Sequence, residues 1–310
     1  MNDSSLSGQA SHSLPLEFAF LALLSLLWSA SYGLIKLAVE TITPVTLVAI
    51  RVVIAASVLW LVVIAQRRQI PTGLAVWRQL IVKAFIGFIV PFTMITWGQQ
   101  YVESGLAGIL NSTTPIFLFL ITVFWTRHEQ VTWENSVGGL AGSGGASLLI
   151  GMEALNGLGA HVAGQLAITG ATISYATAMI HGKQFKGIAP EATAACTLTI
   201  AAIILLPVSF AVENPLELTP SRTSVMALMA LAVFSTAGAF TLYFRLVNTL
   251  GSVGISSVTY SRAAISVVIG VLVLGEAFNW QIAVGMCAVI IGVAAINGQL
   301  FPLVTRARRT

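Results

Sequence analysis

Long stretches without a charged residue run through most of this chain. Six of them, each of 18 to 23 residues, cover 18–35, 84–102, 104–126, 135–152, 192–212 and 223–244. A helix needs about 20 apolar residues to cross the hydrocarbon core of a bilayer, and only helices or closed barrels can span it. The alternating pattern of barrel strands is absent. These runs therefore predict an all-α integral membrane protein.

The composition excludes a soluble fold. Hydrophobic residues make up 56% of the chain and charged residues 8%, whereas soluble domains carry about 25% charged residues. So little charge could not cover the surface of a soluble protein of this length.

Turn residues divide the apolar sequence into ten expected transmembrane helices. Their spans are 15–36, 43–65, 80–101, 104–126, 133–152, 160–181, 190–211, 223–246, 252–274 and 279–299.

The two halves of the chain match at a spacing of 147 residues. The matching pairs are Trp28 and Tyr175, Lys36 and Lys183, Glu129 and Glu276, Trp133 and Trp280, Gly138 and Gly285, and Gly145 and Gly292 (for example, 175 − 28 = 147). Many secondary transporters are built of repeats, with the substrate site between them. We expect two five-helix repeats, at 15–152 and 160–299, between a disordered tail at 1–14 and a basic tail at 300–310.

Basic residues set the expected orientation. With the N-terminus in the cytoplasm, the loops and tail on that side carry eleven Lys and Arg residues, and the opposite side carries only Lys36 and Arg222. This bias predicts that both termini are cytoplasmic. Because each half has an odd number of helices, the second half enters the membrane inverted. Two inverted halves can expose a central site to either side in turn.

Several ordered motifs resemble the drug/metabolite transporter superfamily, in its EamA-like family. In the first half they are Leu27-Trp28-Ser29-Ala30-Ser31-Tyr32 with Lys36, Pro44 and Arg51, then Trp97-Gly98-Gln99-Gln100-Tyr101 with Ser104, Gly105, Pro115, Glu129 and Trp133. In the second half they are Gly164, Ser174-Tyr175-Ala176, Leu274-Gly275-Glu276, Trp280, Gly285 and Gly292. The resemblance covers about residues 15 to 298.

The resemblance implies two inverted five-helix repeats, with helices one to four and six to nine around a central cavity. Members move amino acids, drug-like cations and other small metabolites, often outward. The chain departs from the family at Arg262, where helix nine commonly has a proline and where the repeat places the counterpart of Pro115. Arg262 is therefore the most individual residue of the chain.

Arg262 lies about ten residues from either end of its expected helix. A charge at that depth is costly unless it faces a partner, water or a cavity. Its guanidinium could bind a substrate carboxylate, or backbone carbonyls in a helix break could hold it. Thr259 would lie on the same helix face. For Arg51, nearer the start of its helix, a positioning or interfacial role is favoured.

Other polar and aromatic residues share inward helix faces with these groups. The expected substrate-binding residues are Trp28, Tyr32, Trp97, Gln100, Asn111, Tyr175, Thr259 and Arg262. Aromatic rings with a few polar groups suit an amphiphilic organic solute and could hold an ammonium group. Simple helix packing is the alternative for each ring. Gly138, Gly142, Gly145, Gly285 and Gly292 indicate close helix packing, in a monomer or across a homodimer.

The sequence favours a secondary carrier in a plasma membrane or bacterial inner membrane. The favoured function is export of amino acids or related compounds, and the alternative is import or exchange of organic anions. The only Asp is Asp3 and the Glu residues lie near helix ends or in loops, so a facilitator or exchanger is favoured over a proton-driven pump. We expect no enzyme, cofactor, metal or nucleic-acid partner, because clustered catalytic groups and metal-ligand spacings are absent.

Overall fold

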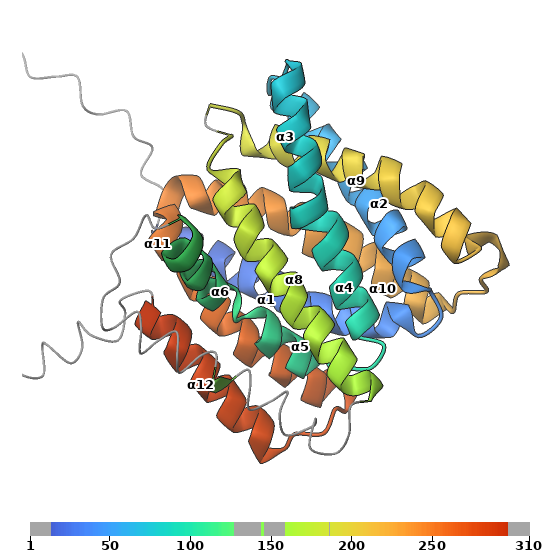
Figure 1. The fold of residues 1–310 in the computed structure, drawn as a ribbon, viewed down its shortest axis with the longest axis vertical. Helices are drawn as coiled ribbons and strands as arrows, with labels where there is room; N and C mark the ends of the chain where they lie inside the picture. The colour runs from blue at the N-terminus through green and yellow to red at the C-terminus, as the bar shows by residue number, and fades with distance from the viewer. Residues whose placement is uncertain (1–13, 127–143, 146–158, 186, 297–310) are drawn as a thin grey trace, which may run out of the picture.

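The protein is described by a computed structural model over residues 14–126, 144–145, 159–185 and 187–296. Within these residues all regular structure is helical, and no strand occurs. The elements, drawn in Figure 1, are α1 (Leu14–Val39), α2 (Pro44–Ala65), α3 (Leu74–Ala84), η1 (Phe85–Ile89), α4 (Val90–Gly98), α5 (Ser104–Asn111), α6 (Thr114–Ile121), η2 (Thr122–Thr126), α8 (Ala160–Gly182), α9 (Pro190–Val212), η3 (Pro215–Glu217), α10 (Arg222–Ala232), η4 (Val233–Gly238), α11 (Ala239–Leu274) and α12 (Trp280–Ile296).

Six helical stretches of this part are long and apolar enough to cross a membrane. They are Pro15–Val39, Pro44–Ala65, Leu74–Gly98, Ser104–Phe124, Pro190–Val212 and Arg222–Leu250. Shorter apolar helices cover Ser261–Leu274 and Trp280–Ala295. The all-helical membrane character is thus confirmed. The expected fifth helix at 133–152, most of the tail at 1–14 and the basic tail at 300–310 lie outside the described residues.

The third and fourth helices differ from their expected spans. The third begins at Leu74 rather than residue 80, directly after Gly73, whose φ of 98° a helix cannot contain. It ends at Gly98, so Gln100 lies in the following turn. The fourth is interrupted after Asn111, where Pro115 supplies no backbone N–H to the carbonyl four residues earlier.

Helix α11 turns back on itself, although its helical hydrogen bonding continues from Ala239 to Leu274. Trp28 of α1 contacts Tyr243, and Glu17 contacts Thr249, so the first arm of α11 runs antiparallel to α1. Ser29 contacts Arg262, and Gly33 lies against Ile269, so the last arm runs parallel to α1. The reversal lies between 249 and 261, close to the expected connection between the helices at 223–246 and 252–274.

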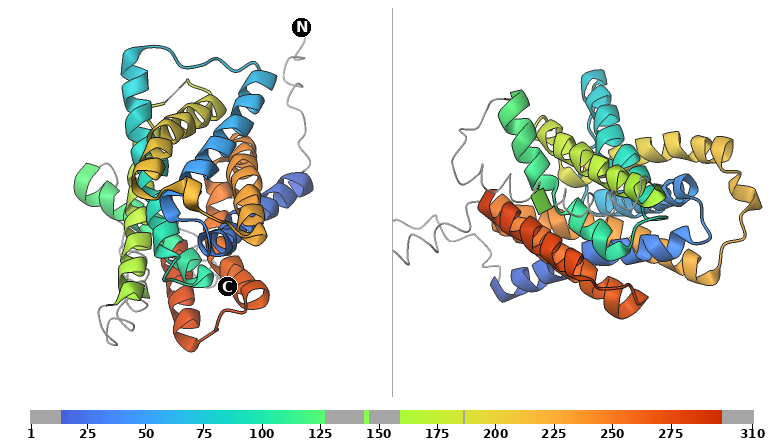
Figure 2. Two further views of the ribbon diagram at one scale, coloured as in Figure 1. Left: turned by 90° about the vertical axis from the view of Figure 1, so that its right-hand side faces the viewer. Right: turned by 60° about the horizontal axis from the view of Figure 1, so that its bottom comes forward.

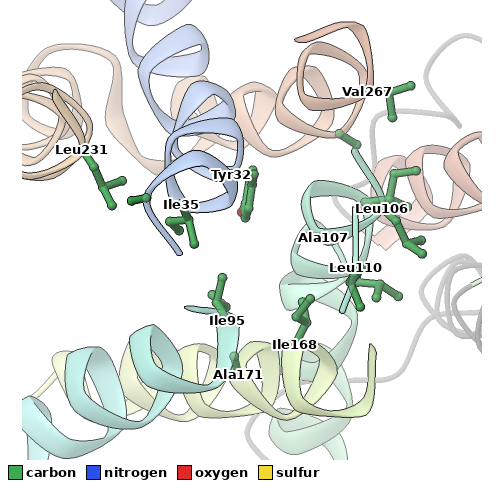
Figure 3. Close-up of a cluster of buried hydrophobic side chains, with 14 of the residues drawn as sticks. Tyr32, Ile35, Ile95, Leu106, Ala107, Leu110, Ile168, Ala171, Leu231 and Val267 are labelled. Carbon is green, nitrogen blue, oxygen red and sulfur yellow. The ribbon is translucent and has the colours of Figure 1, made fainter. Parts of the chain in front are cut away.

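The buried core joins helices far apart in the chain. Helix α2 packs along α9, α4 along α8, and α1 along α10 and α11, while α5 lies against α11 (Figure 2). One cluster places Tyr32 of α1, Ile95 of α4, Leu110 of α5 and Ile168 of α8 around a common centre (Figure 3). A second cluster fills the space between α2, α9 and the end of η1.

Two carboxylates from the later part of the chain hold helix starts in the earlier part. Glu213, just after α9, accepts hydrogen bonds from the backbone N–H groups of Val45 (3.0 Å) and Thr46 (2.7 Å) at the start of α2. Glu276, just after α11, accepts bonds from those of Ser104 (2.6 Å) and Gly105 (2.9 Å) at the start of α5. Each carboxylate satisfies amides that the helix cannot satisfy itself and meets the positive end of its dipole.

Candidate functional site

The interruption of helix four positions the first part of the candidate site. Because Pro115 cannot donate a hydrogen bond, the Asn111 carbonyl is free of its usual helical partner. It accepts a bond instead from Nη2 of Arg262 at 3.2 Å and another from the Thr114 hydroxyl at 2.7 Å. The two positions that differ between the halves, Pro115 and Arg262, therefore belong to one local arrangement.

Tyr32 connects this arrangement to helix α1. The Tyr32 hydroxyl accepts a hydrogen bond from the Asn111 side-chain amide, and both residues are buried. The Tyr32 backbone carbonyl accepts a bond from the Gln99 side chain at 2.8 Å. Lys36, one turn further along α1, donates to the Gln99 carbonyl at 3.0 Å and the Val102 carbonyl at 3.1 Å. These bonds fix α1 against the ends of α4 and α5.

Arg51 of α2 is a second arginine in the interior, only 6% exposed. Its Nε donates to the Thr236 hydroxyl at 2.9 Å, and its guanidinium lies 3.8 Å from the centre of the Phe92 ring. Thr236 belongs to the π-helical turn η4, and its hydroxyl also donates to the Leu231 carbonyl. A π-helical turn breaks the regular hydrogen-bond ladder and commonly marks a functional position.

Tyr175 of α8 lies between the surroundings of the two arginines. Its side chain is partly buried and packs against both core clusters. The second cluster contains Phe92, which lies against the Arg51 guanidinium, and the first contains Tyr32, which is linked to Arg262 through Asn111. Five of these residues are called the centre below. The centre combines the guanidinium groups of Arg51 and Arg262 with the phenol groups of Tyr32 and Tyr175 and the side-chain amide of Asn111.

The two positive charges of the centre have no carboxylate partner among the described residues. Neither Arg51 nor Arg262 forms an ion pair with a carboxylate there. Nε of Arg262 and Oδ1 of Asn111 are buried without a hydrogen-bond partner. Buried polar groups are nearly always paired in proteins, so these two neighbouring atoms are available to bind a polar ligand. No cluster of three metal-ligating side chains occurs in this part of the chain.

The remaining expected site residues divide into two groups. Thr259 lies half-buried on α11, one turn before Arg262. Trp28 packs its ring against Phe240 and Tyr243, with centroids 6.4 Å and 5.5 Å away. Trp97 and Gln100, by contrast, are exposed, and Trp97 packs edge-on against Tyr101. The structure therefore gathers Tyr32, Asn111, Tyr175 and Arg262 and leaves Trp97 and Gln100 apart from them.

Sequence reasoning missed two interior residues. Gln99 is completely buried, whereas its neighbour Gln100 is exposed. The sequence favours a positioning or interfacial role for Arg51, but its guanidinium lies in the interior against Phe92 and Thr236. A charge seven residues into an apolar helix was the available signal for Arg51. Nothing in the sequence separates Gln99 from Gln100.

Several known proteins similar to this chain are named as transporters. The sequence is 25% identical to the "uncharacterized transporter YoaV" of Bacillus subtilis, over 87% of this chain and 92% of that protein. It is 24% identical to the "uncharacterized inner membrane transporter YedA" of Escherichia coli, over 93% of each chain. It is also 25% identical to an S-adenosylmethionine/S-adenosylhomocysteine transporter of Chlamydia trachomatis, over 81% of this chain and 80% of that protein.

A solved crystal structure shares the fold, with a TM-score of 0.65 at 19% identity over 92% of this chain and 98% of that chain. The sequence model of the EamA-like transporter family matches this chain twice, at residues 16–151 and 162–298. The two matches together cover nearly all of the chain. The chain therefore belongs to the EamA-like transporter family, within the drug/metabolite transporter superfamily, and is a membrane transporter.

Proposed function

We propose that this protein is a secondary transporter that exports amino acids or related amphiphilic metabolites across the bacterial inner membrane, or plasma membrane, by alternating access. The observation that carries the proposal is Arg262, which is held beside Asn111 in the interior with its Nε unpaired among the described residues. A guanidinium presents five donors, and the Asn111 carbonyl uses only one of them. The remaining donors suit a substrate carboxylate.

The packing of the described helices supports two inverted repeats. Under that symmetry α2 is equivalent to α9, and the pair formed by α1 and α10 is equivalent to the pair formed by α8 and α4, and these helices pack as pairs. The π-helical turns η1 and η4 begin 148 residues apart (233 − 85 = 148), close to the sequence repeat of 147. The family match at 16–151 and 162–298 has the same division.

The proposed orientation places both termini in the cytoplasm. It rests on the excess of basic residues in the connections and tail on that side. The carboxylates Glu213 and Glu276 then lie at the outer end of the bundle, and Glu17, which pairs with Arg245, lies at the inner end. The protein acts as a monomer or as a homodimer, and it needs no cofactor, metal or nucleic acid.

A substrate with an amino acid group fits the central residues. Arg262 offers donors for a carboxylate, and the unpaired Asn111 oxygen offers an acceptor for an ammonium group. The aromatic ring of Trp28 and its partner Tyr243 supply an apolar surface nearby. The Chlamydia trachomatis relative named as an S-adenosylmethionine/S-adenosylhomocysteine transporter handles compounds that carry such a group.

Import or exchange of organic anions is the second candidate. Arg51 favours it, because this second cation is buried without a described carboxylate partner and so increases the affinity of the centre for negative charge. The two candidates share carboxylate recognition and differ in direction and in the need for an ammonium group.

Flux measurements in proteoliposomes test the proposed function. A panel of amino acids, organic anions and organic cations is loaded inside, and release is followed with and without a pH gradient. We expect counterflow of carboxylate-bearing solutes without a pH gradient, and its loss in a folded Arg262→Ala protein. Unchanged flux in that variant would remove Arg262 from the site. Strict dependence on a proton gradient would exclude the facilitator or exchanger mechanism.

A further inference from the structure

The two interior arginines come from different halves of the chain. Arg51 lies on α2 over the Phe92 ring, in the second core cluster, and Arg262 lies on α11. Arg262 is linked through Asn111 to Tyr32 of the first cluster, and Tyr175 of α8 packs against both clusters. The two arginines belong to separate hydrogen-bonded groups, because Arg51 binds Thr236 and Arg262 binds the Asn111 carbonyl. The centre therefore has two distinct cationic positions.

The described carboxylates do not neutralise these charges. Glu17 pairs with Arg245 and also accepts from Thr249, while Glu213 and Glu276 cap the starts of α2 and α5. Arg51 contacts the Thr236 hydroxyl and the Phe92 ring, and neither group carries a charge. Two positive charges in a membrane interior are costly unless a partner of opposite charge arrives.

Each guanidinium retains donors for such a partner. Arg51 uses Nε for Thr236 and one face of its guanidinium plane for the Phe92 ring, which leaves both Nη groups without an acceptor among the described residues. Arg262 uses Nη2 for the Asn111 carbonyl and leaves its buried Nε unpaired. Two N–H groups on one edge of a guanidinium match the two oxygens of a carboxylate.

We propose that the transported solute carries two carboxylates, one bound by Arg51 and the other by Arg262, so that its binding neutralises both halves of the centre. The proposal rests on the transport function above and narrows its substrate class to dicarboxylates, including acidic amino acids. A zwitterion or a monocarboxylate leaves one arginine uncompensated. Because one carboxylate contacts each half, the solute also connects the two halves that alternating access must move.

A set of four-carbon probes separates charge from size. Succinate carries two carboxylates, butyrate carries one, and 4-aminobutyrate carries one carboxylate and one ammonium. The purified full chain in detergent is titrated with each probe at constant ionic strength, and the affinity follows from the rise in its melting temperature. We expect succinate to bind at least about tenfold more tightly than butyrate or 4-aminobutyrate, because each of these lacks the second carboxylate and so loses one charged contact with an arginine. Malonate and glutarate test other carboxylate separations.

Variants assign the two carboxylates to the two arginines. Arg51→Gln and Arg262→Gln should each reduce the preference for succinate over butyrate to about twofold or less, because one cation then remains. The matched control is Arg78→Gln, at an exposed position on α3, which should keep the wild-type preference. If a glutamine variant does not fold, Arg51→Lys or Arg262→Lys keeps the charge and should weaken succinate through loss of paired donors.

The outcomes separate the two proposals. Equal binding of succinate, butyrate and 4-aminobutyrate by the wild type would overturn the dicarboxylate assignment, as would stabilisation by none of the three dicarboxylates beyond the salt control. Flux of neutral amino acids in the same preparation would then leave the transport function standing. Binding of succinate with no flux of any solute would instead support the two-arginine site and contradict transport.

Discussion

The side-chain amide of Asn111 donates a hydrogen bond to the hydroxyl of Tyr32, and the Asn111 carbonyl accepts one from Arg262. One residue thus connects helices α1, α5 and α11 at the point where Pro115 interrupts helix four. Its side chain and its backbone make separate contacts, so the two can be tested separately. The Tyr32 hydroxyl is the simpler group to remove.

Tyr32→Phe should reduce transport more than stability. The substitution removes one hydrogen bond, worth about 1 kcal/mol of unfolding free energy, and leaves the Asn111 amide without its partner beside Arg262. We expect the release rate of a carboxylate-bearing solute from proteoliposomes to fall about tenfold, with a small change in melting temperature. Tyr101→Phe, which removes a hydroxyl from a ring packed on Trp97, is the control. A Tyr32→Phe protein with wild-type flux would show that this contact is only structural.

The positions of most helices can be predicted from the sequence because each helix corresponds to a long run of residues without charge. Charge-free runs of about 20 residues admit few other structures in a membrane protein. Proline and glycine gave several boundaries correctly, such as the start of α2 at Pro44. The early start of α3 at Leu74 differs from the prediction because Arg78 and Gln79 separate residues 74–77 from the apolar run that follows.

The residues of the site are harder to predict, because which side chains face the interior depends on the rotation of each helix about its axis. Regular helical spacing predicts that Trp97 and Gln100 face inward. The π-helical turn η1 inserts extra backbone before them and rotates the following residues about the helix axis. The helix then ends at Gly98, and the interior position goes to Gln99. An apolar sequence contains no sign of such a turn, so no periodicity argument could have corrected the prediction.

Gly164→Ala should destabilise the contact between α4 and α8. A Cβ at Gly164 would lie 2.9 Å from the Gly98 carbonyl oxygen and 2.9 Å from the Val102 side chain. Because the first of these is backbone, the helices must separate. We expect a loss of about 1–3 kcal/mol of unfolding free energy, measured as a lower melting temperature in detergent. Gly159→Ala, where an added Cβ meets nothing within 4 Å, should cost little. Equal melting temperatures for the two variants would contradict this close approach.

Glu276→Gln should weaken the attachment of the last arm of α11 to the start of α5. The carboxylate accepts from Ser104 and Gly105 through both oxygens, whereas an amide offers one oxygen and turns its NH₂ group towards the second donor. We expect a loss of about 1–3 kcal/mol, as for other charge-assisted hydrogen bonds. Glu217→Gln, at an exposed position, is the matched control and should melt with the wild type. A Glu276→Gln protein that also melts with the wild type would show that the capping bonds contribute no stability.

Glu213 should make stability depend on pH below the neutral range. Burial opposes its charged form, but hydrogen bonds from Val45 and Thr46 outweigh burial and lower the pKa of Glu213 below its ordinary 4.5. Because the folded pKa is the lower one, the stabilisation is complete above pH 4.5 and is lost as the pH falls through the folded pKa. Glu213→Gln should therefore melt below the wild type at pH 7, and the gap should close in acid. Other carboxylates titrate in both proteins and cancel from the difference. A gap that stayed constant from pH 7 down to strong acid would contradict a capping role for the ionised carboxylate.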